Sequence, residues 1–183
     1  METDHKPAAL SCLDLLAEQY PTVEAASAAL VRLRAFLQLP KGTEYYFSDL
    51  HGEHEAFIHL LRSASGTIRD KINAIHGAAL LETDLDELAS LIYYPEQILR
   101  QRRAAGDTAE WERMMIYRLM PVLQEVCRKY AHDHVDALTS SKYHFVIREL
   151  IGSSEDPAKS VYYRELIAAA VDAGIGGGLI TNL

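Results

Sequence analysis

The clearest candidate for chemistry in this chain is the short run Asp49-Leu50-His51-Gly52, which follows an aromatic segment ending at Phe47. The aromatic residues predict a strand over 44–48. In an extended segment, residues two apart point to the same side, so Asp49 and His51 would face the same way. A carboxylate oxygen and an imidazole nitrogen are common ligands of divalent metal ions. The pattern therefore predicts Asp49 and His51 as metal ligands, beside a turn that Gly52 makes possible.

The elements around this run would position it for chemistry. Open α/β sheets place their sites at the carboxyl ends of strands, which is where Asp49 and His51 would lie. The residues that follow, 53–62, have the pattern of polar and apolar side chains that an amphipathic helix shows. A metal site between a strand end and a helix start is therefore the arrangement that the sequence predicts.

The run from Phe47 to Glu53 resembles the first signature block of the calcineurin-like metallophosphoesterases, and it is most similar to the class III fructose-1,6-bisphosphatases. The segments 15–22, 39–43 and 91–96 support the same resemblance, which extends from about Leu13 to near the end of the chain. Members of that family are several times longer. Their later blocks, Gly-Asp-x-x-Asp-Arg and Gly-Asn-His-Glu, do not occur here.

The resemblance implies hydrolysis of the 1-phosphate of fructose 1,6-bisphosphate in gluconeogenesis, supported by Mn²⁺. Asp49 and His51 would bind the first ion, and the later blocks would supply the remaining ligands and the catalytic acid. We therefore expect the chain to be the N-terminal part of a longer enzyme. It would contain no catalytic residue of its own, bind manganese weakly or not at all, and be inactive alone.

Composition predicts a soluble cytoplasmic protein. The 183 residues are 49% hydrophobic and 24% charged, which suits one domain over 1–183 with its own core. A formal charge of −8 argues against a nucleic-acid partner. We see no membrane-spanning run and no signal peptide, and we expect Cys12 and Cys127 to be reduced, buried thiols. The partner implied by the resemblance is a sugar bisphosphate.

The fold predicted for the chain is mainly α, with about eight helices and one short strand. In the full-length family the fold would be an α/β calcineurin-like sandwich into which this helical region is inserted. Thr22 is a plausible N-cap, followed by an apolar stripe from Val23 to Leu37 that we expect to be core. Residues 111–130 predict a long amphipathic helix. The triplet Gly176-Gly177-Gly178 is expected to be the most flexible part of the chain.

Two other functions fit parts of the pattern. The chain could be a helical regulatory or interaction module with a vestigial metal motif. It could instead be a helical His-Asp phosphohydrolase built on His132 and Asp133, with His76 and Asp172 as loose further candidates. The orphan strand at 44–48 would be paired across a homo-oligomer or left as an open edge.

Overall fold

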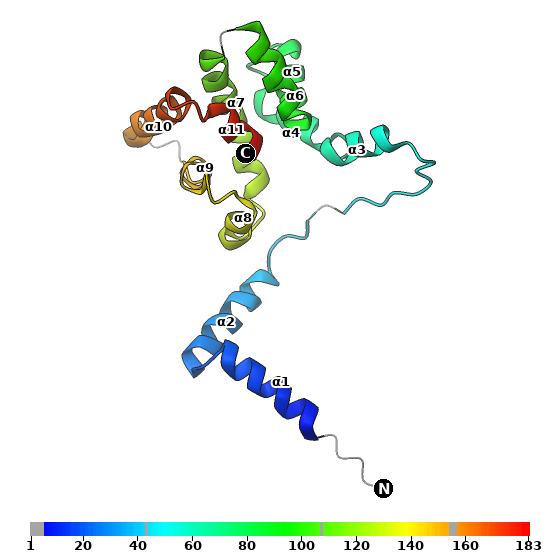
Figure 1. Ribbon diagram of the computed structural model, residues 1–183, viewed down its shortest axis with the longest axis vertical. Coiled ribbons are helices and arrows are strands. Elements are labelled where there is room, and N and C mark those ends of the chain that lie inside the picture. The colour runs from blue at the N-terminus through cyan, green and yellow to red at the C-terminus, as the bar shows by residue number, and fades with distance from the viewer. Residues whose placement is uncertain (1–5, 43, 107, 154–156) are drawn as a thin grey trace. The chain divides into compact units, whose positions relative to one another are not determined.

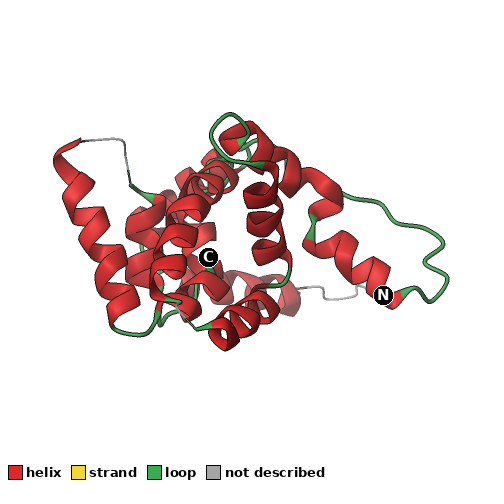
Figure 2. Cartoon of the chain, turned by 90° about the horizontal axis from the view of Figure 1, so that it is seen from above, coloured by secondary structure: helices red, strands yellow, loops and turns green. Residues whose placement is uncertain are grey.

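The computed structural model describes residues 6–42, 44–106, 108–153 and 157–183. The backbone forms two compact units, Met1–Lys41 and Gly42–Leu183. Throughout the described residues the regular structure is helical, and no strand is present among them (Figure 2). The prediction of a mainly α chain is confirmed. The prediction of one domain over 1–183 stays a prediction.

The N-terminal unit consists of α1 (Lys6–Gln19) and α2 (Val23–Phe36). The predicted cap of α2 is confirmed, because the amide of Ala25 donates to Thr22 Oγ1 at 3.1 Å. The expectation that the α2 stripe forms core is not met. No residue of α2 is buried, and Leu30 and Leu37 are 49% and 80% exposed. Within this unit the two helices form a single layer, so the unit by itself cannot enclose its apolar stripes.

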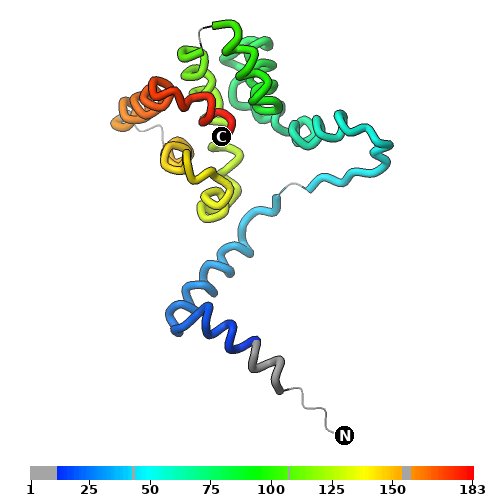
Figure 3. Tube along the Cα trace, in the orientation of Figure 1, coloured from blue at the N-terminus to red at the C-terminus, as the bar shows by residue number. Residues whose placement is uncertain are grey.

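The C-terminal unit holds the remaining described helices, whose course can be followed in Figure 1 and Figure 3. They are α3 (His54–Arg62), η1 (Ala64–Gly66), α4 (Thr67–His76), α5 (Glu82–Tyr93), α6 (Pro95–Ala105), α7 (Ala109–Cys127), α8 (His132–Leu138), α9 (His144–Ile151), η2 (Pro157–Lys159), α10 (Ser160–Asp172) and α11 (Gly176–Asn182).

Helix α7 organises this unit, since it contacts α4, α5, α9, α10 and α11. The helix predicted over 111–130 forms up to Cys127, and its positions Trp111, Met115, Leu119 and Val122 are buried. The end of the predicted stripe is not core, because Val126 and Tyr130 are 37% and 45% exposed. The other helices close the core around it with mainly aliphatic side chains. The largest fully buried side chains are Ile72, Leu88, Leu91, Met115, Ile116, Ile147, Leu150, Ile167 and Leu179.

The glycine triplet is part of helix α11, which corrects the prediction of a flexible segment. Gly176 and Gly177 are buried. A Cβ at Gly176 would overlap the Glu112 carboxylate, and a Cβ at Gly177 would lie 2.5 Å from an Arg103 nitrogen. The glycines therefore allow the start of α11 to lie directly against α6 and α7, a close approach that larger residues would prevent.

The predicted strand at 44–48 is wrong, because this segment is irregular in the structure. The backbone is not extended at the two residues of interest either, since Asp49 and His51 have φ values of 54° and 49°. A strand needs a neighbour to satisfy its backbone groups, and no other strand lies in the described part of the chain. The segment therefore runs as a loop into α3.

The two cysteines are free thiols in different surroundings. Cys12 is exposed, so the expectation that it is buried is wrong. Cys127 is half-buried at the end of α7, where burial raises the pKa of its thiol. Among the described residues, no helix combines the length and the low polarity that crossing a membrane would require.

Candidate functional site

The Asp49-His51 loop is held by a tight turn in front of α3. The amide of Glu53 donates to the Leu50 carbonyl at 2.9 Å, and the amide of His54 donates to the Gly52 carbonyl at 2.8 Å. Gly52 adopts a φ of 76°, in the left-handed region that glycine enters without strain. The turn therefore joins the loop to the first residue of the helix and limits how far the loop can move from it.

The aromatic residues before the loop attach it to the helical unit. The Phe47 ring packs edge-on against Phe57 of α3, with ring centres 5.5 Å apart, and Tyr45 stacks on Phe47 at 6.5 Å. The Tyr45 hydroxyl and Thr67 Oγ1 of α4 are hydrogen-bonded at 2.5 Å. These contacts join the segment before the loop to α3 and α4.

Asp49 and His51 are both exposed on this loop. Their backbone is left-handed rather than extended, so the argument that a strand turns both side chains to one side is wrong. The described residues contain no group of three or more His, Cys, Asp or Glu side chains that could hold a metal ion. Among the described residues, no third His, Cys, Asp or Glu therefore joins Asp49 and His51 in such a group, and the assignment of these two as metal ligands stays a prediction.

The residues of the His-Asp alternative are spread over three helices. His132 and Asp133 begin α8, while His76 in α4 is hydrogen-bonded through Nε2 to the Arg118 carbonyl at 2.8 Å. Asp172, in α10, forms an ion pair with an arginine of α7. Since no three such side chains form a possible metal group in the described residues, this alternative loses its geometric basis.

An aromatic and cationic cluster on α3 and α5 is a feature that sequence reasoning missed. His59 Nδ1 and the Tyr94 hydroxyl are hydrogen-bonded at 2.8 Å, and the two rings stack at 6.0 Å. The Arg62 guanidinium lies over the Tyr94 ring at 5.1 Å. The spacing of His59 and Arg62 on one helical face is the only sequence signal for it. The cluster joins α3, and with it the loop, to the end of α5.

Among the described residues, the most buried carboxylate is not on this loop. Glu112 of α7 is only 7% exposed. Burial raises the pKa of Glu112, while the Arg103 charge and a hydrogen bond from the Gly177 amide act in the opposite direction. The Glu112 carboxylate occupies the space that a Cβ at Gly176 would need. We therefore assign Glu112 a structural role at the start of α11.

Comparison with known proteins decides the family. The family model described as Firmicute fructose-1,6-bisphosphatase matches residues 11–183. This chain belongs to that family. It is 38% identical over 176 residues to the class 3 fructose-1,6-bisphosphatase of Clostridium tetani (strain Massachusetts / E88), a match that covers 95% of this chain. It is 40% identical over 165 residues to the class 3 enzyme of Clostridium botulinum (strain Hall), covering 89% of this chain.

The resemblance found in the sequence is thereby confirmed. The two matches cover 27% and 25% of the relatives' own lengths, so this chain spans about a quarter of the class 3 fructose-1,6-bisphosphatases that it matches. No solved structure matches the chain.

Proposed function

We propose that this chain supplies one part of a metal-dependent fructose-1,6-bisphosphatase, which hydrolyses the 1-phosphate of fructose 1,6-bisphosphate in gluconeogenesis in the cytoplasm. The observation that carries the proposal is the family match over residues 11–183. Relatives named as class 3 fructose-1,6-bisphosphatases at 38% and 40% identity support it. The substrate is then a sugar bisphosphate.

In this proposal Asp49 and His51 donate one carboxylate and one imidazole to a Mn²⁺ site. Both side chains lie on an exposed loop, so they can bind a metal ion whose other ligands come from another polypeptide segment. When bound, a pair of divalent ions would neutralise phosphate charge and acidify a water molecule. The contribution of this chain is to hold the two donors in place, through the turn at Gly52 and the packing of Phe47 on Phe57.

The remaining ligands and the catalytic acid would come from the part of the class 3 enzymes that this chain does not match. The calcineurin-like sandwich would also be completed there. Two donors leave most of a five- or six-coordinate shell to water, so residues 1–183 alone should bind Mn²⁺ weakly and show no turnover.

A chimera tests this function. In the Clostridium tetani class 3 enzyme, the segment that matches this chain is replaced by residues 1–183, and phosphate release from fructose 1,6-bisphosphate is measured with Mn²⁺. We expect activity from the chimera and none from residues 1–183 alone. Since changing groups that merely support metal ligands costs about 10–100-fold, Asp49→Asn or His51→Ala should reduce activity by at least about that much.

Asp133→Asn is the matched control, because it removes the carboxylate of the competing His-Asp hypothesis. It should leave activity and Mn²⁺ affinity unchanged. A folded chimera without activity would favour the non-catalytic helical module. Turnover by residues 1–183 alone, or activity that survives Asp49→Asn but not Asp133→Asn, would show that the ligands are assigned to the wrong residues.

A further inference from the structure

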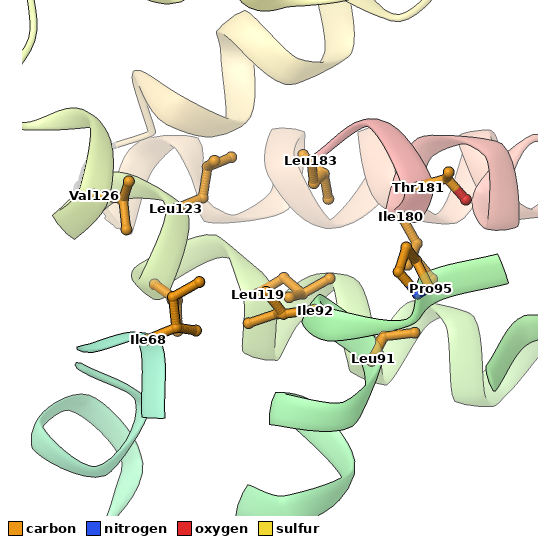
Figure 4. A pocket seen from close by; sticks show the side chains of 11 residues that line it. Ile68, Leu91, Ile92, Pro95, Leu119, Leu123, Val126, Ile180, Thr181 and Leu183 are labelled. Carbon is orange, nitrogen blue, oxygen red and sulfur yellow. The ribbon is translucent and has the colours of Figure 1, made fainter. Parts of the chain in front are cut away.

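The C-terminal unit carries a groove that the proposed function does not use. Its first part is a cavity of about 230 Å³ between α4, α5, α7 and α11. Figure 4 shows Ile68 on one side, Leu123 and Val126 of α7 on another, and Leu183 beside them. A second cavity of about 350 Å³ continues toward α8 and α9, and it shares Leu123, Val126 and Leu183 with the first. The two cavities therefore form one groove along α7.

The lining of the groove suits apolar side chains rather than a sugar phosphate. No Lys or Arg lines either cavity. The one hydroxyl in the first cavity, that of Thr181, already donates to the Gly177 carbonyl at 3.0 Å. Small-molecule sites usually contain a few polar groups that orient the ligand, and the first cavity has no such group to spare. In the second cavity Thr139 and Asn182 already donate to backbone carbonyls, and the rings of Tyr130 and His134 stack on each other. A protein segment with large apolar side chains is the ligand that this chemistry fits.

Several large apolar residues of the groove are open to solvent. Val126 is 37% exposed, Tyr130 45% and Leu138 75%. Contiguous exposed apolar surface on a folded unit marks a place where another surface packs. A second copy of this chain, placed with the same groove across a two-fold axis, would set one hollow against another, and such a pair cannot reach the packing density of a protein interface.

The comparison with relatives supplies an occupant. About three quarters of each of these class 3 enzymes lies outside the part that matches this chain, since the matched shares are 27% and 25%. We propose that the groove along α7 binds apolar side chains of the polypeptide that corresponds to this unmatched part. The inference rests on the proposed function, because it names the partner that completes the phosphatase, and it assigns that contact to a surface separate from Asp49 and His51.

Cysteine labelling tests the inference. Cys12 and Cys127 are first replaced by Ser, and then Val126→Cys places a thiol in the groove. Val161→Cys on α10 is the matched control, since Val161 is 55% exposed and lines neither cavity. In residues 1–183 alone, both thiols should react readily with a maleimide. In the Clostridium tetani chimera, labelling at 126 should slow by about tenfold or more, while labelling at 161 stays unchanged.

The outcomes separate the possible occupants. Equal labelling at 126 in the chimera and in residues 1–183 would overturn the inference. Labelling at 126 that is slow in residues 1–183 and becomes fast on dilution would also overturn it, because a second copy would then cover the groove. Phosphate release is measured separately on the same chimera. Protection without activity would contradict the proposed function alone, and activity without protection would contradict this inference alone.

A second measurement covers the case in which the chimera does not fold. Residues 1–183 are co-expressed with the unmatched polypeptide of the Clostridium tetani enzyme, and co-purification is measured. Val126→Asp should abolish co-purification, and Val161→Asp should not. Co-purification that is equal for both variants, or absent for the unchanged chain, would refute the assignment of the groove.

Discussion

Replacing Gly176 by Ala should destabilise the C-terminal unit, because a Cβ at this position has no room. It would overlap the Glu112 carboxylate and lie 2.9 Å from Val171 Cγ2. Both neighbours are buried, so neither can swing into solvent. Overpacking of this kind costs about 1–3 kcal/mol, and the better helix propensity of Ala offsets up to about 1 kcal/mol of it. We expect the free energy of unfolding to fall by about 1–2 kcal/mol in total.

The assay is urea unfolding followed by the fluorescence of Trp111, the single tryptophan of the chain, which lies beside Glu112 in α7. Gly152→Ala is the matched control. Gly152 is exposed, has an α-helical backbone and offers a Cβ a contact of 3.3 Å to the Arg148 carbonyl. Its effect should stay within about 1 kcal/mol.

A double-mutant cycle with Glu112→Ala checks the cause. If the Glu112 carboxylate is what Ala at 176 displaces, the cost of Gly176→Ala should fall by about 1 kcal/mol or more in the Glu112→Ala background. The same cost in both backgrounds, or a cost no larger than that of Gly152→Ala, would refute the reasoning.

Three further variants test other contacts. Burial raises the pKa of Glu112 in the folded chain, so the protonated carboxyl stabilises the fold. This stabilisation is complete below about pH 4.5, the ordinary pKa of the group, and it is lost as the pH rises through the raised pKa. Glu112→Gln should remove this dependence, and a stability difference from wild type that is independent of pH would contradict it. Glu87→Ala should cost about 1–3 kcal/mol and shift the Trp111 emission, because the indole N–H donates to Glu87 Oε1 at 2.9 Å; an unchanged spectrum and urea midpoint would count against it. Thr22→Ala should weaken α2 by about 1 kcal/mol, seen as faster amide exchange at Ala25; exchange at the wild-type rate would show that the cap does not protect it.

Local patterns in the sequence were sufficient for the long helices. The spacing of Trp111, Met115 and Leu119 predicts α7 because a helix repeats every 3.6 residues wherever it packs. Thr22 predicts the start of α2 because its hydroxyl bonds to an amide only three residues away. The motif around Asp49 identified the family because it stands in one continuous run, and the family match over 11–183 confirms it.

Features that depend on distant residues were decided by the tertiary structure. Residues 44–48 have the composition of a strand, yet a strand forms only with a partner, and the described chain offers none. The glycine triplet has the composition of a flexible segment, yet it begins a helix whose first two residues are buried. Glu112, more than sixty positions earlier, occupies the space that a side chain at 176 would need, and Arg103 does so at 177. The groove along α7 joins residues from α4 to α11, and no single stretch of sequence contains it. Sequence spacing acts along the chain, whereas close packing and backbone pairing act between segments, which is why only the folded chain settles them.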